Sequence, residues 1–212
     1  MPQPYSARVV SPLEAHELAI KFYAVDSVEL GPRDFVPIFH EWIQSHCLED
    51  EVMIDVADYS HVYHGPGVIL MCHEGQYSLD QAGGRLGLLY TRKRRTEGDV
   101  RSRLRRAFGA ALKACMLLQA EPAVEGKLHF RYDEALFKIQ NRLLAPRTPE
   151  AFDAVKEGLQ PFLGELYPEA DDIQVEAVGE PKDPFAVRIA VSQDPSIGDV
   201  PDIADLVSRL KH

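Results

Sequence analysis

The apolar positions in the first half of the chain follow two different periods. Residues 18–26 form a run of apolar and β-forming residues that ends near Gly31-Pro32, which is typical of a strand. Side chains then recur at helical spacing and predict an amphipathic helix over 34–47: Phe35, Ile38, Phe39, Trp42 and Ile43. Further apolar runs predict strands at 51–57 and 67–74, and residues 75–93 predict a hairpin folded at Gly83-Gly84.

A long helix and a second set of elements follow. Apolar residues from Val100 to Leu118 keep to one face and predict a helix over 97–121, with Thr96 and Asp99 as a loose capping pair. Thr148 and Pro149 begin a second helix over 148–166, in which Pro161 predicts a kink or a division into two short helices. Strands are predicted at 127–132, 135–145, 172–178 and 185–191, and a closing helix at 203–210.

The two halves share the order strand, helix, strand, strand. Matching segments lie 117 residues apart for the first strand and the helix, and 118 apart for the last strand. We predict an α+β fold of two tandem βαββ units with mixed or antiparallel sheets, packed as one compact body. The units span 17–95 and 126–194, with a connecting amphipathic helix at 96–122 and a C-terminal helix at 200–211. The alternative is two unrelated α+β segments with the same element order.

Charge and cysteine content narrow the functional classes. The formal net charge is -10, which disfavours nucleic acid and anionic membranes unless the basic residues are segregated. The three cysteines form no C-x-x-C pair and are typical of a reducing compartment. Neither a signal sequence nor an apolar stretch of membrane-spanning length is present in the sequence, so we expect a cytoplasmic protein.

One polar loop carries the densest set of chemically active residues. It begins the stretch "DYSHVYHGPGVILMCHE", residues 58–74. The loop itself, "DYSHVYHG" at 58–65, is several residues longer than the corresponding loop "GEPKD" of the second unit, so folding does not require the extra length. Mixed imidazole and carboxylate groups are ligands for zinc, manganese or iron, or act as an acid/base pair. The candidates for a ligand, or for a divalent transition metal, are Asp55, Asp58, His61, His64, His73 and Glu74. His73 and Glu74 are expected in a strand, on opposite faces. Solvated loop histidines and a pocket without catalysis are the alternatives.

A basic segment is the second candidate site. Eight cations lie within residues 92–106 of an otherwise acidic chain, which indicates a patch for phosphate, nucleic acid or an acidic partner. The candidate anion-binding residues, with one from the hairpin, are Arg85, Arg92, Lys93, Arg94, Arg95, Arg101 and Arg105. The alternative is the outer face of a helix that pairs with the protein's own carboxylates.

Three segments together resemble a family of uncharacterised bacterial proteins: "HGPGVILMCHEGQYSLD", "GRLGLLYTRKRR" and "NRLLAPRTPEAF". The resemblance covers about residues 18 to 192. It implies a free-standing bacterial protein and assigns no catalytic residues.

The first functional hypothesis is a binding or adaptor protein that recognises a protein or small-molecule partner through residues 58–74 and 92–106. A metal-dependent hydrolase at Asp55, Asp58, His61, His64 and His73 is the second. Nucleic-acid binding through Arg92 to Arg106 is the third, and the net charge disfavours it. All three hypotheses are compatible with a homo-oligomer.

Overall fold

The computed structural model describes residues 11–25, 29–63, 65–95, 97–192 and 203–210. Within these residues the fold is α+β, as predicted, with a single eight-stranded sheet in which every neighbouring pair is antiparallel. The strand order is β2-β3-β4-β5-β1-β6-β8-β7. The strands are β1 (Leu18–Ala24), β2 (Met53–Tyr59), β3 (Gly67–Cys72), β4 (Gly75–Asp80), β5 (Gly87–Arg92), β6 (Phe130–Ile139), β7 (Asp172–Ala177) and β8 (Phe185–Ser192).

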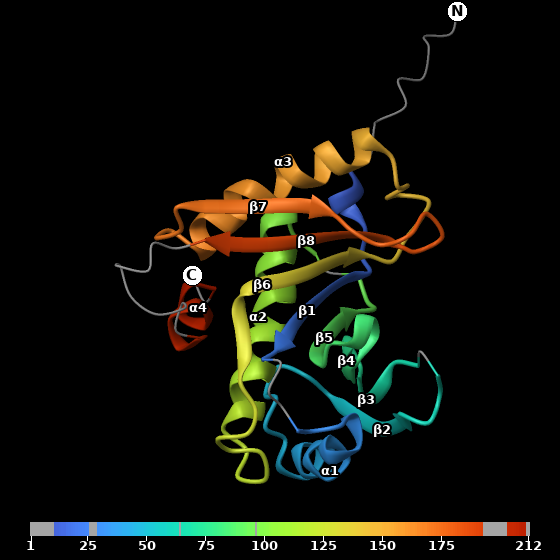
Figure 1. Cartoon of the computed structure of the whole chain (residues 1–212), viewed down its shortest axis with the longest axis vertical. Helices are drawn as coiled ribbons and strands as arrows, with labels where there is room; N and C mark the ends of the chain where they lie inside the picture. Colours follow the sequence, from blue (N-terminus) through green and yellow to red (C-terminus); the bar gives the residue numbers. More distant parts are fainter. Residues whose placement is uncertain (1–10, 26–28, 64, 96, 193–202, 211–212) are drawn as a thin grey trace, which may run out of the picture.

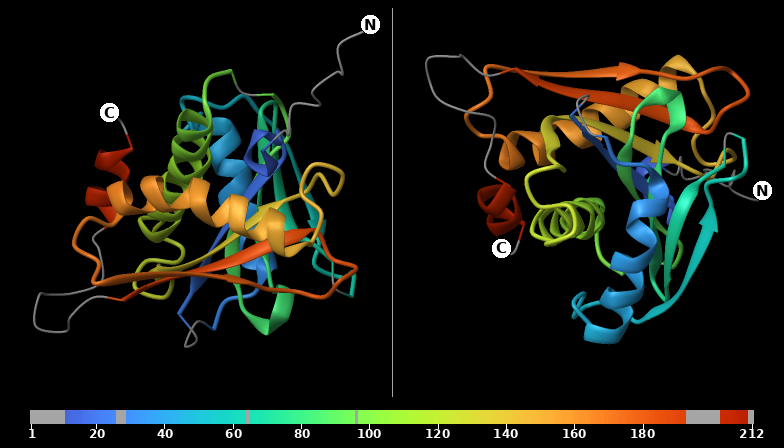
Figure 2. Two further views of the ribbon diagram at one scale, coloured as in Figure 1. Left: turned by 90° about the horizontal axis from the view of Figure 1, so that it is seen from above. Right: turned by 60° about the horizontal axis from the view of Figure 1, so that its bottom comes forward.

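Helices gather on one face of this strongly twisted sheet (Figure 1, Figure 2). They are α1 (Val36–Ser45), α2 (Val100–Gln119), α3 (Pro149–Leu166) and α4 (Ile203–Arg209), with short 3-10 turns η1 (Pro12–Glu14), η2 (Pro32–Phe35) and η3 (Ala82–Gly84). Within the described part of the chain, no helix combines the length and apolar character needed to cross a membrane.

The core lies between the sheet and α2. Phe108 of α2 contacts Phe22 of β1, Phe137 of β6 and Phe162 of α3, with ring centroids 5.0 to 6.4 Å apart. All four rings are buried, and each contributes about 1.5–3 kcal/mol by leaving water. Because β1 pairs with β6, this core is shared by both halves of the chain. The long helix therefore packs into a common core, in addition to connecting the halves.

Several predicted boundaries need correction. The long helix begins at Val100, with Asp99 as its N-cap accepting from Ser102 N, while Thr96 lies outside the described residues. The two strands predicted at 127–132 and 135–145 are one strand, β6, which runs from Phe130 to Ile139. The chain turns after this strand, where Asn141 Oδ1 accepts from Leu143 N and Leu144 N. α3 runs through Pro161 as one helix, since Pro161 is exposed and the carbonyl it leaves unbonded can face water.

The predicted order of strand, helix, strand, strand is present in each half. The pairing differs, however: β6 pairs directly with β8, whereas the β4–β5 hairpin separates β1 from β3. The hairpin turns at Gly83-Gly84 as expected. Parts of the predicted units at 26–28, 193–194, 200–202 and 211 lie outside the described residues.

Candidate ligand-binding site

Asp55 of β2 and Asp58 at the start of the long loop form hydrogen bonds and ion pairs with nearby residues. Asp58 accepts from Ser60 N at 2.8 Å and from the Ser60 hydroxyl, and it lies 3.3 Å from Arg33 Nε of η2. The bonds from Ser60, ahead of the Arg33 charge, lower the pKa of Asp58. Asp55 lies opposite Met71, next to a β-bulge, and its carboxylate accepts from Val56 N at 2.8 Å. Both carboxylates therefore stabilise local backbone.

His61 lies in an exposed turn beside the tip of the β4–β5 hairpin. Together these segments line a groove of about 430 Å³, with Tyr59, His61 and Tyr63 on one side and Gln81 and Gly83 on the other. His64 lies outside the described residues. Among the residues that are described, no three or more His, Cys, Asp or Glu side chains come together in a way that could hold a metal ion. The predicted metal site thus gains no support from these residues.

His73 and Glu74 occupy the turn between β3 and β4. The prediction of a strand with the two side chains on opposite faces was wrong, because β3 ends at Cys72 and β4 begins at Gly75. Because the two residues are not in a strand, their side chains can lie on the same side, and His73 Nδ1 is 3.1 Å from Glu74 Oε1. Lys93 N and Arg94 N donate to the Glu74 carbonyl, and Arg94 Nε donates to the His73 carbonyl. The predicted His/acid and basic segments therefore meet at this turn.

A chain of polar groups runs inward from Glu74. Glu74 Oε2 accepts from Arg92 Nη2 at 2.6 Å. Arg92 Nη1 lies 3.5 Å from the Tyr90 hydroxyl, which lies 3.4 Å from Glu51 Oε1. The last two distances are long for hydrogen bonds and contribute little on their own. They nevertheless place Arg92, Tyr90 and Glu51 in one cluster.

Gly75 allows this approach. A Cβ at position 75 would lie 3.0 Å from the Tyr90 ring and hydroxyl and 2.7 Å from the Thr91 carbonyl oxygen. A side chain there would require the Thr91 backbone and the Tyr90 ring to shift.

The cluster forms one end of a cleft of about 680 Å³, which we call the α2 cleft. This volume falls within the range of about 300–1,000 Å³ that is usual for small-molecule sites. One wall comes from α2, and α4 lies beside it (Figure 1). Apolar lining comes from Leu48, Ala110, Met116, Val207 and Leu210, and polar or aromatic lining from Asp50, Glu51, Glu74, Tyr77, Tyr90, Arg92, Arg105, Arg106 and Lys113.

Electrostatics differ between the two parts of the cleft. Burial raises the pKa of Glu51, against the opposing effect of the Arg92 guanidinium, and also raises the pKa values of Tyr77 and Tyr90. Burial likewise raises the pKa of the neighbouring Cys72 thiol to about 12. The end of the cleft formed by Glu51, Tyr77 and Tyr90 therefore disfavours additional negative charge. The wall formed by α2 carries cations that line the same cleft.

The cations of α2 are not equally available. Arg105 donates to Glu165 of α3 and to the Arg209 carbonyl, and Lys113 lies 3.6 Å from Asp50, whose side chain is 93% exposed. Arg106 is exposed and forms no ion pair with the described residues. Arg106 and Lys113 are accordingly the cations on α2 most free to meet a ligand.

The rest of the basic segment is divided among separate contacts. Arg101 pairs with Glu165, and the buried Arg103 donates to the Glu14 carbonyl. Lys93 and Arg95 are exposed and have no ion pair within the described residues. The segment therefore supplies cations to several surfaces and does not form one continuous patch.

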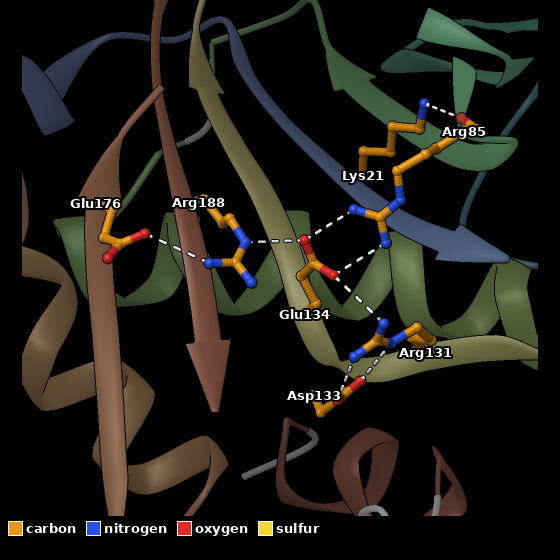
Figure 3. Close-up of polar contacts among 7 residues, drawn as sticks. All are labelled: Lys21, Arg85, Arg131, Asp133, Glu134, Glu176 and Arg188. Atoms are coloured by element: carbon orange, nitrogen blue, oxygen red, sulfur yellow. Dashed lines mark hydrogen bonds and ion pairs between the residues drawn. The ribbon is translucent and has the colours of Figure 1, made fainter. Parts of the chain in front are cut away.

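Arg85, also predicted to bind an anion, already holds a carboxylate (Figure 3). Its two terminal nitrogens each lie 2.9 Å from an oxygen of Glu134, and its guanidinium lies 3.8 Å from the Tyr23 ring centroid. Arg188 Nε donates to the same carboxylate at 2.9 Å. The bonds from Arg85 are the main cause that holds the pKa of Glu134 at about 2. An external anion would have to displace Glu134.

The sequence interpretation did not identify Glu51 or Tyr77 as site residues, and it considered Tyr90 only as a stacking partner beside Arg85 in the hairpin. Glu51 was assigned to the start of a strand, and only the pairing of β4 with β5 brings Tyr77 opposite Tyr90. Lys21 was also missed, although a lysine within the apolar run "LAIKFYA" was a readable signal. It is 1% exposed and pairs with Asp80.

The sequence matches neither the models of known protein families nor the curated proteins with which it was compared. The resemblance to a family of bacterial proteins stays a prediction, and the site is interpreted from its geometry.

Proposed function

We propose that the protein binds a small organic anion with an apolar body in the α2 cleft. The observation that carries the proposal is the position of Arg106 and Lys113 on the same cleft as the largely buried Arg92, in a chain of net charge -10. Cations concentrated in a concave site against an acidic background attract anions selectively. This develops the prediction of a binding protein and uses Glu74, Arg92 and Arg105 from the two predicted segments.

The apolar lining supports a ligand with a hydrocarbon or aromatic portion. Met116 of α2 and Val207 and Leu210 at the C-terminal end of the chain contribute to the wall beside the cations. Sites of this kind combine an apolar surface with a few polar groups that fix the orientation of the ligand.

Calorimetric titration with three matched probes tests the proposal: benzoate, phenyl phosphate and benzyl alcohol. Benzoate and phenyl phosphate should bind, and the neutral alcohol should bind at least about tenfold more weakly. Replacing Arg106 and Lys113 together by alanine should weaken anion binding by about tenfold or more, since each cation contributes a charge-assisted contact.

Lys182→Ala provides the control, because Lys182 is exposed in the turn between β7 and β8 and does not line the cleft. Equal binding of all three probes, or anion binding that survives the double substitution, would contradict the proposal.

We also propose that the two halves arose by duplication of a βαββ unit, with the β4–β5 hairpin added to the first copy. Support comes from the register of β1 and β6, in which Ile20 pairs with Phe137, residues that are 117 positions apart. Sequences of homologues from other organisms test this proposal. In homologues whose two halves have diverged least from each other, the similarity between the halves should be higher at this offset of 117 positions.

A further inference from the structure

We infer that the α2 cleft takes up its anion together with a proton on Glu51, so that binding of one anion adds no net charge to the cleft. The inference rests on the proposed function and adds the charge state in which the site accepts its ligand.

Glu51 lines the cleft and has an incomplete set of hydrogen bonds. Oε2 is buried and has no hydrogen-bond partner, and Oε1 makes a long contact of 3.4 Å with the Tyr90 hydroxyl. The Glu74 backbone N–H also lowers the pKa of this carboxyl, but burial has the larger, opposite effect. A carboxylate with few donors is poorly solvated, and in a buried position it favours the neutral acid. Burial has already raised the pKa of this carboxyl in the empty cleft.

The groups around Glu51 carry both signs of charge. Arg92 of β5 attracts the Glu51 carboxylate, but it is largely neutralised by Glu74, whose carboxylate is 2.6 Å away. Tyr77, Tyr90 and Cys72 are neutral neighbours, because burial raises their pKa values. Asp50, Arg105, Arg106 and Lys113 line the more open part of the cleft.

An anion in this cleft brings a second negative charge toward Glu51. Two like charges in a partly desolvated site disfavour each other, so the anion raises the pKa of Glu51 further. Below the pKa of Glu51 in the free protein, the affinity for the anion is highest and does not vary with pH. Above that value it falls by up to about tenfold per pH unit, until the pKa of the complex is passed.

The alternative is that Glu51 stays ionised and Arg92 alone holds the anion. In that case no proton is taken up, and Glu51→Gln should strengthen anion binding equally at every pH by removing the repulsion. For the wild type, the first possibility therefore predicts an affinity that falls as the pH rises, and the second predicts an affinity that does not vary with pH.

His73 is the imidazole beside Glu74 at the edge of this cluster, with Nδ1 3.1 Å from Glu74 Oε1. A positive charge on this ring would also attract an anion. A His73→Asn variant separates the two contributions.

The test is calorimetric titration with benzoate and with benzenesulfonate, both of which remain singly charged between about pH 5 and about pH 8. Each titration is run in two buffers of different ionisation enthalpy, which gives the number of protons taken up without any substitution. We expect uptake of up to one proton per anion and falling affinity with rising pH in the wild type and in His73→Asn.

Glu51→Gln should bind without proton uptake and with a flat pH profile, and Asp50→Asn should keep the wild-type profile, because Asp50 is solvated. Circular dichroism establishes that each variant is folded.

Binding of both anions without proton uptake by the wild type would overturn this inference and leave the proposed function standing. Proton uptake that persists in Glu51→Gln, or disappears in His73→Asn, would also overturn it. If neither anion binds the wild type at millimolar concentration, the proposed function fails and this inference fails with it.

Discussion

Glu134 of β6 and Arg85, which lies between the β4–β5 turn and β5, form a two-bond ion pair with both N–O distances at 2.9 Å. The Glu134 side chain is 6% exposed, and Arg188 of β8 adds a third bond. The pair joins the hairpin of the first half to the sheet of the second half across β1 (Figure 3). It therefore fixes how the two halves share one sheet.

Replacing Glu134 by glutamine should destabilise the protein by about 3 kcal/mol, because it leaves two arginines without their buried counter-ion. Chemical denaturation gives the change in the free energy of unfolding. Glu176→Gln is the control: Glu176 is largely exposed and lies 3.4 Å from Arg188 Nη1, so its loss should cost less than about 1 kcal/mol. Equal losses in both variants would show that the pair does not hold the hairpin.

The same carboxylate predicts a pH dependence of stability. The folded-state pKa of Glu134 is about 2, below its ordinary value of 4.5, so its ionised form stabilises the folded state. This contribution is complete above the ordinary value and is lost as the pH falls toward 2. We expect the difference in unfolding free energy between wild type and Glu134→Gln to shrink between these values. A difference that is constant with pH would contradict this assignment.

Lys21 of β1 and Asp80 of β4 form a buried ion pair. Desolvation lowers the pKa of Lys21, and Asp80 opposes this shift. Lys21→Met should destabilise the protein by about 3–5 kcal/mol, because it leaves Asp80 buried without its cation. In the double variant Lys21→Met/Asp80→Asn most of that loss should be recovered, since the amide oxygen can still accept from Ala82 N.

A double-mutant cycle by urea denaturation measures the recovery. Additive losses in the two single variants would mean that Lys21 and Asp80 act independently.

Elements with a strong hydrophobic period could be predicted from the sequence. Features that depend on which strands pair with each other could not. The helices expected at 34–47 and 148–166 correspond to α1 and α3 because their apolar stripes face the core. The turn at His73 and Glu74 was missed since it contains neither glycine nor proline, so the apolar strand before it seemed to continue. The α2 cleft was not predictable because Glu51, Tyr90 and Arg92 meet only through the sheet order.

Two glycine positions test the packing around the α2 cleft in opposite directions. Gly75→Ala should destabilise the protein by about 1–3 kcal/mol, because its Cβ would meet the Thr91 carbonyl oxygen at 2.7 Å and force Tyr90 to move. Gly109→Ala should stabilise it by up to about 1 kcal/mol, since alanine favours the helix and its Cβ would lie 3.8 Å from Leu210, an ordinary contact.

Thermal unfolding followed by circular dichroism measures both glycine variants. Because Tyr90 lies between Glu51 and Arg92, Gly75→Ala should also weaken benzoate binding. If Gly75→Ala unfolds at the wild-type temperature, β4 and β5 can move apart without cost, and the close approach at Gly75 does not position Tyr90.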